Sequence, residues 1–186
     1  MRKETPPSRI EDVLDFWFEQ LSPQDWFNGG DAVDERIRNR FGELHEALRE
    51  QVPESWRASA RGMLAAVIAL DQFPRNIYRG TSRAFAADGS ALALAREAIA
   101  RGLDRELPIA ERKFLYLPFE HSEDPGEQVR SVELFATLQS EQDLSYALRH
   151  KEIIDRFGRF PHRNAALARV STPEETEFLK EPGSSF

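Results

Sequence analysis

The feature that most constrains the fold is a helical spacing of apolar residues that returns along most of the chain. Near the N-terminus, apolar residues three or four positions apart share one face of a helix: Ile10, Val13, Leu14, Trp17 and Phe18. No segment alternates apolar and polar residues with the β-branched enrichment of a half-buried strand. The sequence therefore predicts an all-α fold of seven or eight helices.

After this first helix, periodicity and capping residues predict further helices over residues 33–48, 54–72, 88–101, 108–116, 124–138, 144–157 and 172–179. The helix over 54–72 is apolar on more than one face, so it is expected to be the most buried. Short connections favour antiparallel neighbours, which predicts successive helix hairpins in a single domain spanning residues 1–186. Segments 21–30 and 73–87 lose the periodicity and are expected to be irregular.

Composition excludes several classes of protein. The 186 residues include no cysteine, which excludes disulfide scaffolds and thiolate metal sites and fits a cytoplasmic location. No run approaches the ~20 apolar residues that a membrane span needs. The formal net charge of -7 argues against a nucleic-acid or anionic membrane partner. The glycine-rich phosphate loops, the nucleophile elbow and His-Glu-x-x-His are missing, so neither a cofactor nor a metal is expected.

Charge is distributed unevenly among the segments between helices. Residues 72–87 contain Arg75, Arg79 and Arg83 and no acid, and residues 156–173 contain four arginines and no acid. Residues 119–127 are the opposite case, with four acids and no lysine or arginine. Positive charge is therefore concentrated where the helical pattern lapses.

One interpretation of this distribution is structural. The planar fork of arginine matches a carboxylate in two parallel hydrogen bonds, so the loops could fasten helix ends to one another through ion pairs. The acids available for these pairs are Asp71, Glu120 and Glu123, and the arginines are Arg75, Arg159 and Arg163.

The other interpretation is an arginine-lined pocket for a small anionic ligand, a carboxylate or a phosphate. The expected ligand-binding residues are Arg75, Asn76, Arg159, His162, Arg163 and Asn164. The candidates for acid–base catalysis are Glu120, His121 and His162, because carboxylates and imidazoles beside a bound anion can move a proton. Whether the protein is an enzyme stays open at this point.

The remaining two histidines are interpreted as structural. His45 lies among charged residues of a helix, and His150 lies three and four positions before Ile153 and Ile154, at the edge of the core. None of the four histidines has a glutamate three positions before it, as di-iron helix bundles require.

Three long irregular strings resemble the signature segments of a bacterial family catalogued as domain of unknown function 924. They are DQFPRNIYRGT at 71–81, YLPFEHSE at 116–123 and RFGRFPHRN at 156–164. VLDFWF at 13–18, STPEE at 171–175, FL at 178–179 and PGSSF at 182–186 are also similar to this family. The resemblance covers nearly the whole chain. It implies an all-helical fold like tetratricopeptide superhelices and no established activity.

The resemblance adds a second candidate function. Tetratricopeptide-like helix pairs present a concave groove to a peptide or protein partner, and the same arginines could hold a peptide carboxylate. The letters themselves show no consensus repeat of 34 residues. A small-anion site, an interaction module and a purely structural ionic network therefore remain three open interpretations.

Overall fold

The computed structural model describes residues 8–184, apart from the side chains of Ser8, Phe27 and Asn28. Residues 185–186 of the C-terminal string fall outside this description. The described chain consists of helices and irregular connections, without a strand, which confirms the predicted all-α fold. It has more helices than predicted because several short helical turns lie in segments expected to be irregular.

The chain folds into two compact units. The first unit comprises Met1–Arg79 and Arg83–Pro118. Its α-helices are α1 (Ser8–Asp15), α2 (Pro23–Asn28), α3 (Gly30–Glu50), α4 (Glu54–Arg57), α5 (Ala60–Val67), α6 (Phe73–Ile77), α7 (Asp88–Ala100) and most of α8 (Ile109–Glu120). Two π-helical segments, Phe16–Gln20 and Ile68–Gln72, continue α1 and α5, and 3-10 turns occupy Ser82–Phe85 and Leu103–Glu106.

The most buried segment is the one that the sequence predicts as central. Every residue from Met63 to Leu70 is fully buried. The expected continuous helix over 54–72 is nevertheless divided, because Ser59 adopts an extended conformation and caps α5 by accepting a hydrogen bond from Gly62 N at 3.1 Å. At Gly62 a Cβ would lie 2.1 Å from the carbonyl oxygen of Trp56, so this approach requires glycine.

Two segments expected to be irregular contain helices. Residues 23–28 form α2, because Ser22 and Asp25 cap it reciprocally in a capping box and Pro23 suits the first helical turn. Residues 73–77 form α6, in which Pro74 again lies in the first turn. In both segments the sequence suggests that the proline ends a helix, but in the structure the proline lies in the first turn of a new one.

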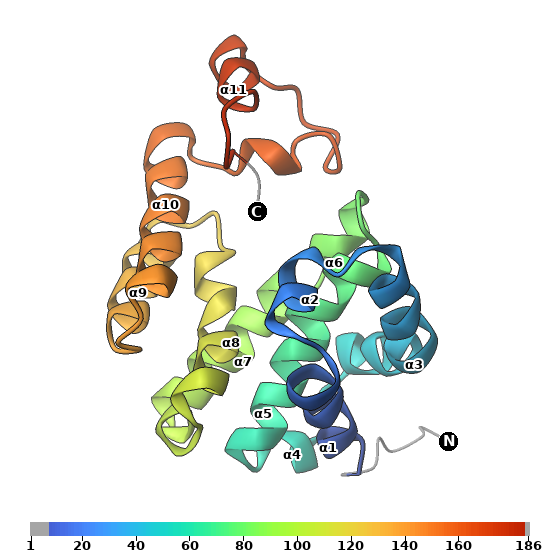
Figure 1. Ribbon diagram of the computed structural model, residues 1–186. Coiled ribbons are helices and arrows are strands. Elements are labelled where there is room, and N and C mark those ends of the chain that lie inside the picture. Colours follow the sequence, from blue (N-terminus) through green and yellow to red (C-terminus); the bar gives the residue numbers. More distant parts are fainter. Residues whose placement is uncertain (1–7, 185–186) are drawn as a thin grey trace. The chain divides into compact units, whose positions relative to one another are not determined.

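The second unit comprises Gly80–Ser82 and Phe119–Phe186. Its helices are α9 (Pro125–Ala136), α10 (Glu141–Phe157), a 3-10 turn at Pro161–Arg163 and α11 (Pro173–Phe178). α9 and α10 form an antiparallel hairpin, as Figure 1 shows. α10 ends at Gly158 in a left-handed conformation (φ 68°), the predicted helix stop. Among the described residues, no helix is long and apolar enough to cross a bilayer.

Candidate functional site

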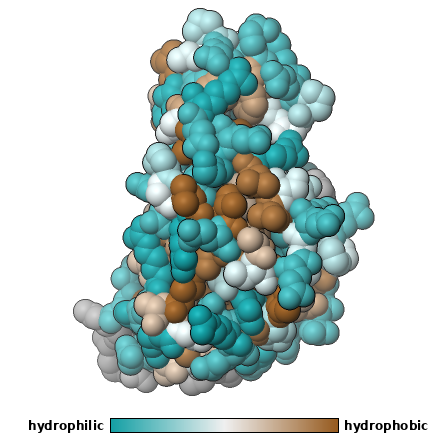
Figure 2. Space-filling model, turned by 90° about the vertical axis from the view of Figure 1, so that its left-hand side faces the viewer, coloured by the Kyte–Doolittle hydropathy of each residue, from teal (hydrophilic) through white to brown (hydrophobic). Residues whose placement is uncertain are grey.

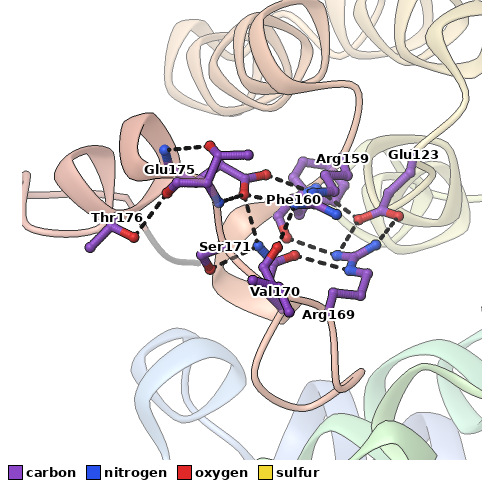
Figure 3. A network of polar contacts seen from close by, with 10 residues as sticks. Glu123, Arg159, Phe160, Arg169, Val170, Ser171, Glu175 and Thr176 are labelled. Carbon is purple, nitrogen blue, oxygen red and sulfur yellow. Dashed lines mark hydrogen bonds and ion pairs between the residues drawn. The ribbon is translucent and has the colours of Figure 1, made fainter.

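Arg159 and Glu175 form the first of two ion pairs that organise the C-terminal part of the second unit (Figure 3). Arg159 donates two hydrogen bonds to the Glu175 carboxylate, at 2.6 and 2.7 Å, and one to the carbonyl oxygen of Val170 at 2.9 Å. Glu175 also accepts a hydrogen bond from the backbone N–H of Thr172, and the two residues form the capping box at the start of α11. The hydrogen bond from Arg159 lowers the pKa of Glu175 to about 2.

Arg169 and Glu123 form the second pair. Arg169 donates to both Glu123 oxygens, at 2.7 and 3.0 Å, and the same carboxylate accepts from the backbone N–H of Phe160 at 2.7 Å. Burial raises the pKa of Glu123, but the hydrogen bonds from Arg169 and Phe160 N–H and the positive charges of Arg169 and Arg163 together lower it below its usual value. Asn164 joins the two pairs, because it accepts from Arg169 at 3.0 Å and donates to Glu175 at 3.3 Å.

The expected ligand residues of the first unit are also engaged. Arg75 donates to both oxygens of Asp88, at 3.0 and 3.1 Å, and to the backbone carbonyl of Asp71. Asn76 donates to Asp34 at 2.8 Å. Arg75 and Arg159 are therefore neutralised by carboxylates within their own units.

A different set of residues surrounds a buried histidine in the second unit. The Nδ1 atom of His150 lies 3.4 Å from Oε1 of Glu120, and both side chains are 5% exposed. The ring of His121 lies 6.3 Å from that of His150, and the ring of Phe160 lies 5.5 Å from it on another side.

Phe160 extends this group toward two further residues. His162 lies 5.6 Å from its ring, and the guanidinium of Arg163 lies 4.6 Å above it. Arg163 is itself buried, whereas His121 and His162 are only partly buried. We call Glu120, His121, His150, Phe160, His162 and Arg163 the histidine cluster.

His150 is held as a neutral imidazole of defined tautomer. Its Nδ1 lies 2.9 Å from the carbonyl oxygen of Tyr146, which can only accept, so Nδ1 carries the proton and Nε2 is the acceptor atom. Burial, together with the electrostatic effect of His121, Arg163 and His162, lowers the pKa of His150 to about 3. A buried histidine among other positive groups is an arrangement found at functional sites more often than elsewhere.

Two polar residues of α9 are buried, and the first of them, Gln128, contacts Glu120. Gln128 donates through Nε2 to the carbonyl oxygens of Glu120, at 2.8 Å, and Ser122, at 2.6 Å. Ser131 lies one turn further along the buried face of the same helix, and neither residue is exposed. Within the described part of the chain, Gln128 Oε1 and Ser131 Oγ are buried without a hydrogen-bond partner.

The structure thus brings together part of the predicted site. Four of its residues, Glu120, His121, His162 and Arg163, gather around Phe160 and His150, whereas Arg159 and Asn164 serve the ion-pair network. Sequence reasoning missed His150 as a site residue, and it also missed Gln128 and Ser131. The available signal was that all three are polar residues on the apolar faces of their helices.

The described residues contain no group of three or more side chains placed to hold a metal ion. The cluster's own chemistry is that of one carboxylate, imidazoles and a guanidinium. These groups can bind an anion, donate hydrogen bonds to it and exchange a proton with it.

Comparison with known proteins places the chain in a family. The model of a family described as "Bacterial protein of unknown function (DUF924)" matches residues 13–183. The solved structure of the protein of unknown function ATU0120 from Agrobacterium tumefaciens is 40% identical to this chain, covers 93% of it and 97% of its own length, and superposes with a TM-score of 0.88. Curated proteins give no match. The chain therefore belongs to the DUF924 family of bacterial proteins.

Proposed function

We propose that the histidine cluster binds a small anionic ligand, a carboxylate or a phosphate. The observation that carries this proposal is the crowding of Arg163, His121 and His162 around one buried histidine that faces one carboxylate, Glu120. Guanidinium and carboxylate groups are seldom fully buried, so the burial of both kinds in one cluster of titratable residues marks a candidate functional site.

The proposal narrows the arginine-lined site expected from the sequence. Arg75 and Arg159 each donate two hydrogen bonds to a carboxylate, so the positive charge of each is neutralised within the protein. Arg163 is buried with its guanidinium 4.6 Å from the centre of the Phe160 ring, and the negative charge of a bound ligand would complement it. His121 and His162, which are partly exposed, would form the solvent side of the site.

The cluster also suits proton transfer to or from the bound anion. Glu120 and His121 are titratable groups of different kinds, and both lie next to His150. Any reaction at this site would use these groups as acid and base. If the protein binds the anion without catalysing a reaction, the charged side chains of the cluster are sufficient.

Thermal unfolding with an anion panel tests the proposal. Phosphate, malate, succinate and acetate are added at constant ionic strength, since screening would otherwise imitate binding. A ligand at about 100 times its Kd should stabilise the folded protein by about 2.7 kcal/mol. We expect at least one anion to raise the midpoint of wild type and not that of Arg163→Met.

A matched control and a milder variant make the result specific. Arg130 pairs with Glu133 on the exposed side of α9 at 2.8 Å, so Arg130→Met removes the same charge without touching the cluster. His162→Gln changes a partly exposed member of the cluster and is expected to fold normally. Equal anion shifts in wild type, Arg163→Met and His162→Gln would contradict the proposal, as would no shift in wild type.

A peptide- or protein-interaction module of tetratricopeptide-like character is the second candidate function. It is favoured by large apolar side chains that the α9–α10 hairpin exposes: Val129, Tyr146 and Leu148. Figure 2, which faces the side of these helices, shows apolar surface gathered between polar residues. If this candidate is correct, Tyr146→Ser with Leu148→Ser should abolish partner capture and leave anion binding unchanged.

A cytoplasmic location is part of the same proposal. The chain contains no cysteine, so it gains nothing from an oxidising compartment. Cell fractionation with an antibody against the protein tests this, and recovery with periplasmic markers would contradict it.

A further inference from the structure

Two buried oxygen atoms bear on the chemistry of the ligand. Gln128 and Ser131 are both 0% exposed, and Gln128 Oε1 and Ser131 Oγ have no hydrogen-bond partner in the described chain. A buried polar atom without a partner lowers stability, so its retention indicates that something else satisfies it.

The orientation of the Gln128 amide is fixed by its other contacts. Its Nε2 lies 2.8 Å from the carbonyl oxygen of Glu120, 2.6 Å from that of Ser122 and 3.4 Å from that of Phe119. Carbonyl oxygens only accept, so the amide nitrogen has to face them and Oε1 faces the other way. Oε1 is therefore an acceptor that needs a donor.

Gln128 contacts the histidine cluster directly, and Ser131 lies on the same buried helix face. Gln128 holds the backbone of Glu120, the residue whose carboxylate faces His150. Ser131 follows Gln128 by one helical turn on the buried face of α9, which packs on α10. Counted from the connection at residues 137–140 of this antiparallel hairpin, the position of Ser131 matches the turn of α10 that precedes His150.

We infer that the ligand of the histidine cluster is a small anion that also carries a hydroxyl group, as hydroxycarboxylates and hydroxyalkyl phosphates do. The anionic group would face Arg163 and His162, and the hydroxyl would donate to Gln128 Oε1 and contact Ser131 Oγ. A carboxylate or an alkyl phosphate dianion without a hydroxyl offers only acceptor atoms, so it leaves Gln128 Oε1 unsatisfied. This inference rests on the proposed function, because it names the ligand class of that site.

Matched pairs of anions test the inference by calorimetric titration of the full chain. Malate and succinate differ by one hydroxyl, and glycerol 3-phosphate and propyl phosphate differ by two. We expect the hydroxyl-bearing member of one pair to bind about two- to tenfold more tightly, the usual value of one neutral hydrogen bond. The pair that shows the preference distinguishes a carboxylate from a phosphate ligand.

Ser131→Ala separates a ligand contact from a structural hydroxyl. The variant removes an unpartnered buried oxygen, so the empty protein should be as stable as wild type or more stable. The preference for the hydroxyl-bearing anion should fall, with a part retained through Gln128 Oε1, while affinity for the hydroxyl-free anion is kept. Ser145→Ala, at an exposed position on α10, is the control and should retain the preference.

The outcomes distinguish this inference from the proposed function. If both members of each pair bind equally and Arg163→Met abolishes both, the site exists and the hydroxyl inference is wrong. If Ser131→Ala destabilises the empty protein and keeps the preference, Ser131 is structural and the inference is also wrong. Absence of binding by every anion overturns the proposed function itself.

Discussion

At the scale of single residues, His150 shows how burial determines chemistry. It lies in the interior of the second unit, donates from Nδ1 to the Tyr146 carbonyl and has a pKa lowered from 6.5 to about 3 by burial. Because the folded pKa lies below the unfolded one, the unfolded chain takes up the proton first as pH falls. The stability that neutral His150 contributes is therefore complete above about pH 6.5 and is lost as pH falls toward 3.

His150→Asn tests this linkage, because an amide nitrogen can replace Nδ1 but does not titrate. Between pH 6.5 and pH 4.5, the free energy of unfolding of wild type should fall more steeply than that of the variant, by at most about 1.4 kcal/mol per pH unit. Urea denaturation at a series of pH values measures both slopes. Glu120, His121, His162 and Arg163 surround His150 in both proteins, so their common contribution cancels to first order. Parallel slopes would show that His150 is not held neutral.

Single residues are predictable from the sequence to different degrees. Glu120, His121, His162 and Arg163 are recognisable as candidates because they are charged or titratable residues between helices. His150 is assigned only to the core edge, since spacing gives its helix face but not what packs there from another helix. The partners of arginines are equally hard to predict: Glu123 pairs with Arg169, a residue 46 positions away.

At the scale of elements, caps decide where helices start and stop. Gly62→Ala should strongly destabilise the protein, because the new Cβ would lie 2.1 Å from the Trp56 carbonyl oxygen, a backbone atom that cannot move alone. Gly42→Ala is the control, since α3 leaves its Cβ position open and alanine favours helix by about 1 kcal/mol. Thermal unfolding should show a midpoint several degrees lower for the first and unchanged or higher for the second. Equal midpoints would contradict the close approach.

Long periodic helices are predictable from the sequence, and short ones are not. The prediction of a helix over 144–157 with a glycine stop is confirmed, because a long apolar face and Gly158 agree. α2 and α6 contain six and five residues, too few for a period to be recognised. In the sequence, their prolines suggest that a helix ends there, although proline is also favoured in a first helical turn.

At the scale of the whole molecule, the sequence predicts the fold class and the family, and the structure adds the division into two units. The first unit carries Arg75 and Asn76, and the second carries the histidine cluster and the ion pairs of Arg159 and Arg169. Composition does not reveal this division, because no linker or change in residue usage marks it. The division depends on which helices pack against one another, and helices far apart in the sequence take part in this packing.

The central claim is that the histidine cluster binds an anion, and the imidazole NMR spectrum tests it most directly. The chain has four histidines, three in the cluster and His45 in the first unit, where it hydrogen-bonds the Ala69 carbonyl at 2.8 Å. Titration with malate or phosphate at constant ionic strength should shift the ring nitrogen signals of His121, His150 and His162 and leave those of His45 in place. Equal movement of all four histidines, or no movement of any, would contradict the claim.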